Sequence, residues 1–263
     1  MEVTDQKDVV AFLISLGRLA PKDKKNSTRV KAAVLQFQKD FGTIKADGKA
    51  GPLTKKAMSI PRCGVSDVLP FREYIRWRKD AFLFTIQAFV PSQTLTNANQ
   101  RDIIYESGQR WAAICGIREW REAKKGENAD VFISTGRGRR DGFDGPGRTL
   151  AWAELPDGND RPLRLKYDLD EIWIGLTEPN GIPFETTTDH ELGHIFGLDH
   201  STNPSDLMYP TLNRSISGPQ AGDIQRMVAE YGPPEIMPTP AREYILTIKG
   251  DLDIKNYQLI PKP

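Results

Sequence analysis

The 263-residue chain has only three histidines and two cysteines, and it lacks any long apolar run. A bilayer span needs about 18 or more apolar residues in succession, so we expect no membrane span. The formal net charge of +1 disfavours nucleic acid as a partner. Cys63 and Cys115 cannot form a disulfide framework, and the N-terminus lacks the basic start and apolar stretch of a secretory signal.

All three histidines lie within one eleven-residue window that runs from His190 to His200. Positions i and i+4 of a helix share one face, so His190 and His194 direct their imidazoles to one point. Gly197 accepts the positive φ that reverses the chain and returns His200 to that point. Three imidazoles around zinc leave a fourth position open for water, which is typical of a catalytic site. Glu191 lies beside that position and is the candidate general base.

A methionine follows the histidines, in the segment Leu207-Met208-Tyr209-Pro210. The alternative of three unrelated histidines is disfavoured, because the full HExxHxxGxxH pattern with its methionine fixes the order of all these positions. This part of the chain resembles the matrixins, or matrix metalloproteinases, a family of metzincin zinc endopeptidases. The resemblance implies that Met208 packs beneath the imidazoles without binding the metal. It also implies hydrolysis of internal peptide bonds, with extracellular matrix proteins as candidate substrates.

The upstream segment PRCGVSD, which contains Cys63, resembles the cysteine switch of matrixin propeptides. In that arrangement a thiolate fills the fourth zinc position and keeps the enzyme latent, consistent with the affinity of zinc for sulfur. By resemblance, Arg62 and Asp67 pair with each other or with their surroundings to hold the loop in the cleft. Ser66 replaces the usual proline, so we expect a less rigid loop. The alternatives are that Cys63 is a buried free thiol or is bonded to Cys115.

The chain divides into four parts. Residues 1–67 resemble the peptidoglycan-binding-like propeptide of matrixins, residues 68–78 form the segment that an activating protease would cut, and residues 79–232 form the catalytic domain. The extension 233–263 is assigned no role. We interpret the first part as a structural propeptide in preference to a glycan-binding module.

The spacing of apolar residues predicts the elements within these parts. In the propeptide we expect three helices, one over 8–16, one capped by Ser27 and one ending at Met58. In the catalytic domain we expect a helix over about 96–115 and strands at 82–86, 117–121 and 129–134, and candidate strands in the extension are 244–248 and 254–260. With the resemblance, this predicts an α+β fold: a zincin-like domain with a twisted mixed five-stranded sheet and three helices, preceded by a small three-helix domain.

The segment FDGPGRT resembles the matrixin calcium loop, in which a carboxylate and several backbone carbonyls hold a hard cation. The resemblance makes Ca²⁺ an expected cofactor besides zinc. The alternative is a tight turn followed by a solvated acidic run. The candidate calcium ligands are Asp144, Gly145, Gly147, Thr149, Asp168 and Glu171.

The chain departs from the family at the site of a second, structural zinc. Where matrixins bind that ion through three histidines and an aspartate, this chain carries Arg140, Asp141, Trp152 and Lys166. One aspartate cannot hold zinc alone, and a neighbouring lysine or arginine repels the ion. We therefore expect a single zinc, and a loop held by packing of Trp152, by calcium and by salt links.

The resemblance also assigns the substrate-binding residues. An extended substrate would pair with the backbone of Leu150 and Ala151. Tyr209, Pro210 and Thr211 would form the wall of the pocket that follows the scissile bond, and we expect that pocket to be apolar. The expected partners are protein or peptide substrates, an activating protease and, as a candidate, a protein inhibitor. We expect a secreted monomer.

Two other classes of protein compete with a latent zinc endopeptidase. One is a noncatalytic module, in which the helical domain binds cell-wall glycan and the second domain has lost turnover. Glu191 disfavours this class, because a scaffold needs no base beside zinc. The other is a purely structural secreted protein.

Overall fold

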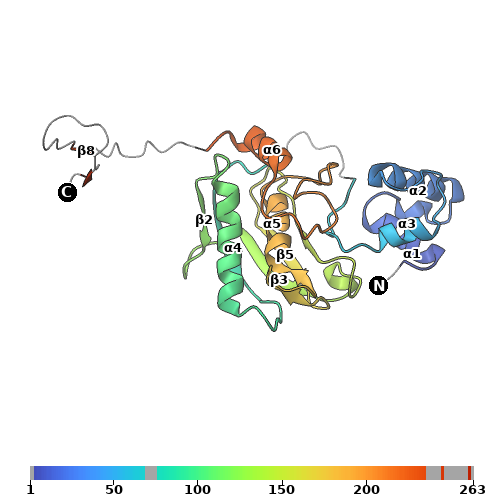
Figure 1. The fold of residues 1–263 in the computed structure, drawn as a ribbon, viewed down its shortest axis with the longest axis horizontal. Coiled ribbons are helices and arrows are strands. Elements are labelled where there is room, and N and C mark those ends of the chain that lie inside the picture. The colour runs from blue at the N-terminus through green and yellow to red at the C-terminus, as the bar shows by residue number, and fades with distance from the viewer. Residues whose placement is uncertain (1–2, 69–75, 235–243, 246–259, 262–263) are drawn as a thin grey trace, which may run out of the picture.

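The structure is a computed structural model, and it describes residues 3–68, 76–234, 244–245 and 260–261. Figure 1 shows a group of short helices at the N-terminal end and a larger part in which helices cover a sheet. Among the described residues, none of the helices has the length and apolar character needed to cross a membrane. Most of the predicted activation segment, residues 69–75, lies outside the described residues.

Three helices form the N-terminal part: α1 (Gln6–Ser15), α2 (Ser27–Phe41) and α3 (Pro52–Met58). The rings of Phe12 and Phe37 meet edge to face, with 5.5 Å between centroids, and join α1 to α2. The predicted three-helix domain is confirmed. The predicted cap Ser27 is wrong, because the side chain of Asn26 accepts a hydrogen bond from the Arg29 N–H at 3.1 Å and starts α2. Asparagine caps a helix at least as well as serine.

The larger part contains a five-stranded sheet in the order β2-β1-β3-β5-β4. Neighbours from β2 to β5 pair in parallel, and β4 pairs antiparallel with β5 at the edge of the sheet. The predicted mixed sheet is confirmed, although the strand expected from residue 117 begins later because its pairing with β1 starts at residue 119. The strands are β1 (Ala81–Ile86), β2 (Glu119–Glu122), β3 (Val131–Gly136), β4 (Ala151–Ala153) and β5 (Leu163–Asp168).

Helices α4 (Asn97–Ala112) and α5 (Phe184–Ile195) pack against each other and against the sheet, and α6 (Ala221–Tyr231) lies beyond one end of α5 (Figure 1). The indole of Trp111 in α4 donates a hydrogen bond to the Asp189 carbonyl in α5 at 2.9 Å. The indole of Trp77 donates to the Ile195 carbonyl at 2.7 Å, and both tryptophans are buried. These contacts fix α5 against α4 and against the segment that precedes β1.

Short elements complete the described residues. The strands β6 (Trp173–Ile174) and β7 (Ile182–Pro183) pair in parallel just before α5, and one-turn 3-10 helices occupy Pro21–Asp23 and Arg139–Asp141. In the extension, β8 (Tyr244–Ile245) pairs antiparallel with β9 (Ile260–Pro261). Residues 246–259, which include most of the two strands predicted there, lie outside the described residues.

Candidate metal centre

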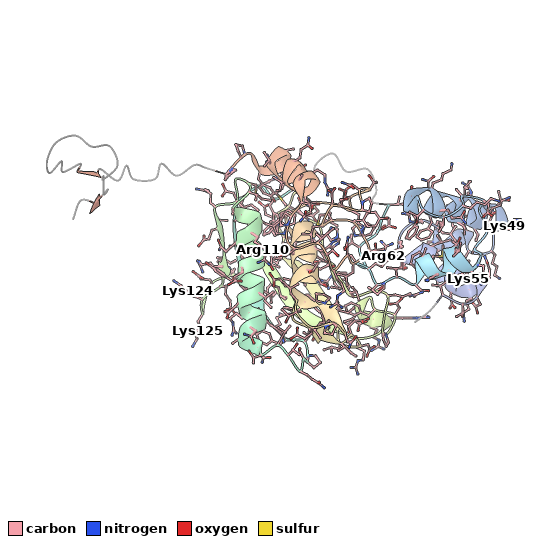
Figure 2. All side chains as sticks on the ribbon, in the orientation of Figure 1. Lys49, Lys55, Arg62, Arg110, Lys124 and Lys125 are labelled. Atoms are coloured by element: carbon pink, nitrogen blue, oxygen red, sulfur yellow. The ribbon has the colours of Figure 1, made fainter. Side chains whose placement is uncertain are left out.

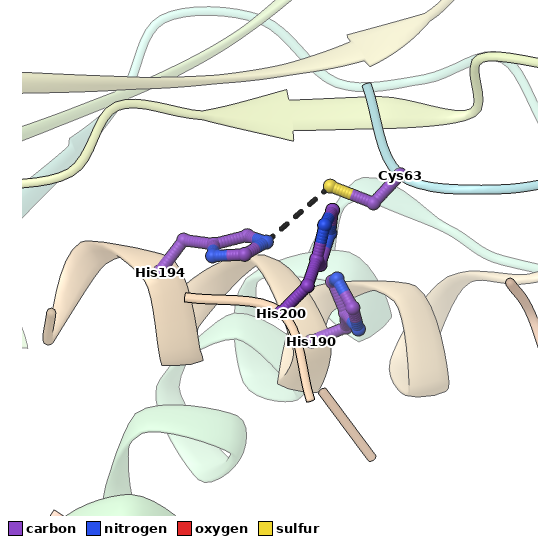
Figure 3. A group of neighbouring side chains, drawn as sticks. All are labelled: Cys63, His190, His194 and His200. Atoms are coloured by element: carbon purple, nitrogen blue, oxygen red, sulfur yellow. Dashed lines mark hydrogen bonds between the residues drawn. The ribbon is translucent and has the colours of Figure 1, made fainter. Parts of the chain in front are cut away.

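The end of helix α5 brings the three histidines together. The Gly197 N–H donates to the His194 carbonyl and the Leu198 N–H donates to the Gly193 carbonyl, both at 2.9 Å. This pair of bonds is a Schellman motif, and it needs the positive φ of +108° that Gly197 adopts. The chain therefore reverses directly after α5, and His200 returns to the face that carries His190 and His194 (Figure 3).

Each imidazole is oriented through its Nδ1 atom. Nδ1 of His190 lies 2.8 Å from the Leu207 carbonyl, and Nδ1 of His194 lies 2.7 Å from the Leu198 carbonyl. A carbonyl only accepts, so these two Nδ1 atoms carry the protons and leave Nε2 free as a metal ligand. Nε2 of His190 and Nε2 of His200 are buried and have no hydrogen-bond partner among the described residues.

The four candidate ligands fit a zinc ion. The nitrogen atoms of the three histidines and Sγ of Cys63 lie within 4.8 Å of one another. Sγ of Cys63 is 3.4 Å from Nε2 of His194 (Figure 3), close to the edge of a tetrahedron with Zn–S of about 2.3 Å and Zn–N of about 2.0–2.1 Å. Burial lowers the pKa of His190 to about 3 and also lowers the pKa of His194 and His200. All three imidazoles are therefore neutral, as metal ligands must be.

Glu191 and Cys63 are acidic groups buried next to the three imidazoles. Both residues are buried, and the Glu191 carboxylate lies beside the thiol without a conventional hydrogen bond from any described residue. Burial raises the pKa of Glu191 to about 8, and burial together with the Glu191 charge raises the pKa of the Cys63 thiol. A divalent ion among the imidazoles reverses both shifts, because it stabilises carboxylate and thiolate.

The floor and wall of the centre are held by residues that the sequence motif does not include. A Cβ on Gly193 would lie 2.3 Å from Sδ of the buried Met208, so only glycine lets the methionine pack under the histidines. The buried Asp223 carboxylate accepts hydrogen bonds from the N–H groups of Leu207 at 2.7 Å and Met208 at 3.2 Å. Asp223 thereby fixes the methionine turn, and no short-range pattern pointed to it.

The Cys63 segment passes through the cleft as an extended strand. Its backbone exchanges hydrogen bonds with both sides: the Gly64 N–H donates to the Ala151 carbonyl at 2.8 Å, and the Cys63 N–H donates to the Pro210 carbonyl at 3.0 Å. The Leu150 N–H donates to the Arg62 carbonyl at 3.0 Å. The propeptide thus uses backbone groups of Leu150, Ala151 and Pro210, three of the residues predicted to bind substrate.

A network of charges fixes this segment to the N-terminal helices and to the metal centre. Arg62, which lies between the two folded parts in Figure 2, forms the predicted ion pair with Asp67. Arg18 also binds Asp67, with 2.8 Å between Nε and Oδ2, and Oδ1 of Asp67 lies 3.2 Å from Nδ1 of His200. The Ser66 hydroxyl donates to the Leu16 carbonyl at 2.9 Å. The roles of Arg18 and Leu16 could not be predicted, because both are distant in sequence.

The candidate calcium ligands surround a buried, unpaired carboxylate oxygen. Oδ2 of Asp168 is buried and has no hydrogen-bond partner among the described residues. Burial, together with the charges of Asp170 and Asp144, raises the pKa of Asp168 to about 6. The neighbouring carboxylates are already engaged: Asp144 pairs with Arg148, and Glu171 accepts a hydrogen bond from the Gly147 N–H at 2.6 Å. In the described part of the chain, these carboxylates are not grouped as tightly as the histidine and cysteine ligands.

An ion pair links Lys166 in β5 to Asp141, in the loop where the sequence analysis expects no second zinc. Nζ of Lys166 lies 2.6 Å from Oδ1 of Asp141, and the indole of Trp152 donates to the Asp141 carbonyl at 2.6 Å. The Arg137 N–H donates to Oδ2 of Asp141 at 3.0 Å. Arg140 is exposed. The predicted salt link and the predicted involvement of Trp152 are therefore both present.

A pocket opens beside His190 and Glu191. Its lining includes the predicted wall residues Tyr209, Pro210 and Thr211. Most of the pocket surface is apolar, in agreement with the expectation, although polar side chains share the wall. The other lining residues outside the metal centre are Leu150, Thr186, Thr187, Asp206, Leu207, Leu212, Asn213 and Ile216.

Comparison with known families agrees with this geometry. Residues 76–232 match the family model of the M10 peptidases, described as Matrixin, and residues 4–58 match the model of a peptidoglycan binding domain. The chain belongs to the matrixin family. The matrixin match starts one residue before Trp77, whose indole is bonded to the end of α5.

Individual matrixins are similar over most of this chain. It is 33% identical to interstitial collagenase B of Mus musculus over 228 residues, which are 83% of this chain and 48% of that protein. It is 32% identical to matrix metalloproteinase-20 of Homo sapiens over 77% of this chain and 42% of that protein. It is 32% identical to macrophage metalloelastase of Rattus norvegicus over 81% of this chain and 46% of that protein. The chain therefore spans about half the length of these relatives.

Proposed function

We propose that this matrixin is a zinc-dependent endopeptidase that is made as a latent precursor. The observation that carries the proposal is the convergence of three imidazoles and one thiol on a single point beside Glu191 (Figure 3). Three neutral nitrogen ligands suit a catalytic zinc, and the thiol is the group that changes between the latent and active forms.

Each residue of the metal centre has a separate role in hydrolysis. When bound, zinc polarises the carbonyl of the scissile bond and acidifies water. Glu191 accepts a proton from the attacking water and passes it to the leaving amine. The imidazoles of His190, His194 and His200 hold the metal, and Met208 packs beneath them.

Substrate binding uses the groups that the Cys63 segment occupies in this structure. The backbone of Leu150 and Ala151 aligns an extended peptide along the edge strand β4, and the pocket bordered by Tyr209, Pro210 and Thr211 receives the side chain after the scissile bond. While Cys63 fills the cleft, substrate is excluded. The support for this step is that the Gly64 N–H and the Arg62 carbonyl already pair with Ala151 and Leu150.

The proposed organisation has four parts. Residues 1–67 are the propeptide, an activating protease cuts within 68–78, residues 79–232 are the catalytic domain, and 233–263 is an extension. The protein is a secreted monomer. Its partners are protein or peptide substrates, the activating protease and a protein inhibitor. Relatives named collagenase and metalloelastase support extracellular matrix proteins as the substrate class.

We also propose one zinc and a calcium ion. The calcium ligands are the carboxylates of Asp144, Asp168 and Glu171 with the backbone carbonyls of the glycine-containing loop, and the buried unpaired oxygen of Asp168 supports this assignment. The single zinc follows from the Asp141–Lys166 ion pair, since a lysine ammonium in that position repels a second zinc. The remaining carbonyl ligands in the loop are those of Gly145, Gly147 and Thr149.

A peptide-cleavage assay tests the function. The purified full chain is incubated with a quenched fluorogenic peptide before and after treatment with trypsin or a mercurial, with Glu191→Gln as the control. We expect cleavage only after treatment, its loss on zinc chelation, and no cleavage by the variant. Binding to peptidoglycan without any peptide cleavage would instead favour the noncatalytic glycan-binding module.

A further inference from the structure

The N-terminal helical part carries a positive charge that the rest of the chain offsets. Residues 3–60 contain twelve basic residues, ten lysines and two arginines, against five carboxylates, which gives a net charge of +7. The whole chain has a net charge of only +1, so the remaining residues are net acidic. Such an asymmetry between two parts of one chain indicates a partner of opposite charge for the basic part.

Four of the five carboxylates in this part are already used within it, whereas its lysines are not. Two of them form the capping box of α1, Asp40 pairs with Arg18, and Asp47 accepts a hydrogen bond from its own loop at 2.9 Å. Across the described residues, lysine ion pairs occur only at Lys79 and Lys166, which both lie in the larger part. The lysine charge of the helical part is therefore not neutralised by the described carboxylates.

Four exposed lysines border one groove of the helical part. Lys24 and Lys25 precede α2, Lys31 lies on α2, and Lys49 lies in the loop before α3. Figure 2 shows Lys49 at the end of the helical part that faces away from the larger part, so the larger part does not cover this lysine. The apolar residues of the groove are Val10, Val30, Val34 and Ala50.

The wall that carries Lys49 is held in place by a buried side chain. Gln38 accepts a hydrogen bond from the Gly48 N–H at 2.7 Å and donates one to the Lys49 carbonyl at 2.9 Å. Gly48 has a φ of +72°, and a Cβ there would lie 2.8 Å from Cγ of Lys31. The loop thus rests on the stem of Lys31, and the groove is formed before any partner binds. Such preorganisation reduces the entropic cost of binding.

The lining of the groove indicates the class of partner. Single-stranded nucleic acid is bound by stacking its bases on aromatic rings or arginine, and the described residues of this groove include neither. A groove bordered by charges suits a linear polymer better than a planar bilayer. A polysaccharide with repeated anionic groups can pair with lysines from three segments at once, and its sugar rings can cover the valines.

We propose that this groove binds a linear acidic polysaccharide and retains the precursor on it. The inference concerns the helical part alone and goes beyond the proposed function, because it adds a partner that is neither substrate nor activating protease. It also adds a role to the part that the sequence analysis interprets as a structural propeptide.

The test measures the affinity of the purified full chain for heparin at 50 and 200 mM salt. The groove variant is Lys24→Gln with Lys31→Gln and Lys49→Gln. Its matched control, with the same loss of charge outside the groove, is Lys39→Gln with Lys45→Gln and Lys56→Gln. We expect the groove variant to bind roughly 100-fold more weakly than wild type, at roughly fivefold per lysine beside an anionic surface. The control stays within roughly threefold, since salt screens distant charges.

The other outcomes each overturn the inference. Equal losses in the two variants would show attraction to net charge without a groove. Tighter binding to phosphatidylserine vesicles or to duplex DNA than to heparin would exclude a polysaccharide as the partner. No heparin binding by wild type overturns the inference while the proposed function stands, because peptide cleavage is measured separately on the activated samples. Circular dichroism checks that both variants are folded.

Discussion

The metal centre and the acidic loop differ in how far their side chains are already positioned for an ion. We define the acidic loop as Asp144, Asp168 and Glu171 with the turn between residues 144 and 149. In the metal centre, carbonyls of Leu207 and Leu198 orient two imidazoles, and the Nε2 atoms face one point. In the acidic loop, Asp144 is paired with Arg148 and Asp168 keeps an unpaired oxygen.

The difference follows from where the ligands come from. Two histidines of the metal centre lie on one helix and the third follows a Schellman turn, so the course of the backbone brings them to one point. The candidate calcium ligands of the acidic loop come from two separated segments and include carboxylates that repel one another. Such a site depends on the ion to offset the repulsion.

The largest expected effect concerns the base of the metal centre. Glu191→Gln removes the proton acceptor but keeps the volume of the side chain, so kcat/KM of the activated enzyme falls by about 10²- to 10⁴-fold. The zinc content stays as in wild type, because the imidazoles are oriented by other groups. Peptide-cleavage kinetics and elemental analysis of the same sample check both statements, and full activity in the variant would exclude Glu191 as the base.

The second effect concerns the thiol that closes the metal centre. Cys63→Ser removes the sulfur ligand, and we expect the untreated chain to gain most of the activity of processed wild type. Cys115→Ser is the matched control, since Cys115 is a buried thiol whose Sγ contacts the Trp111 carbonyl at 3.3 Å. Latency that survives in Cys63→Ser, or that is lost in Cys115→Ser, would contradict the role of Cys63.

A third effect probes the acidic loop through pH. The pKa of Asp168 is raised from 3.8 to about 6 in the folded state, so at pH 7 the ionised carboxylate destabilises folding. That cost is on the order of 3 kcal/mol, and it is relieved as the pH falls through 6, because the carboxylate is protonated in the folded state at a higher pH than in the unfolded state. Calcium offsets the same cost only while the carboxylate is ionised. We therefore expect calcium to raise the melting temperature more at pH 7.5 than at pH 5.

The control for this prediction is Asp168→Asn measured with calcium and with EGTA. Without the titrating carboxylate, the calcium-dependent increase in melting temperature at pH 7.5 becomes more similar to the increase at pH 5. Equal calcium effects at both pH values in wild type would show that Asp168 does not bind the ion.

The smallest expected effect concerns the ion pair in the neighbouring loop. Lys166→Met leaves Asp141 without its partner, and because both side chains are partly exposed the free energy of unfolding falls by only about 0.5–1 kcal/mol. Urea unfolding at low and at high salt measures this loss of unfolding free energy, and the loss is smaller at high salt because salt screens the ion pair. Arg140→Met, a change of an exposed cation in the same loop, has no comparable effect. A large loss of stability with loss of bound zinc would indicate that a metal holds the loop.

Local patterns predicted the histidine cluster and the three N-terminal helices, because spacing along a helix fixes these contacts. The pairing of Arg62 was implied by the family resemblance, which left open whether its partner is Asp67 or another group. The N-cap at Asn26 was assigned one residue late, since adjacent asparagine and serine are both good caps. Contacts between distant segments, such as Arg18 with Asp67 and Asp223 with the methionine turn, leave no periodic signal.

X-ray absorption at the zinc edge of the purified, untreated chain tests the central claim most directly. The account predicts one zinc per chain, with one sulfur at about 2.3 Å and three nitrogens at about 2.0–2.1 Å. Activation removes the sulfur from the spectrum and leaves the nitrogens. Absence of stoichiometric zinc, or a spectrum of the untreated chain without a sulfur neighbour, would contradict the account.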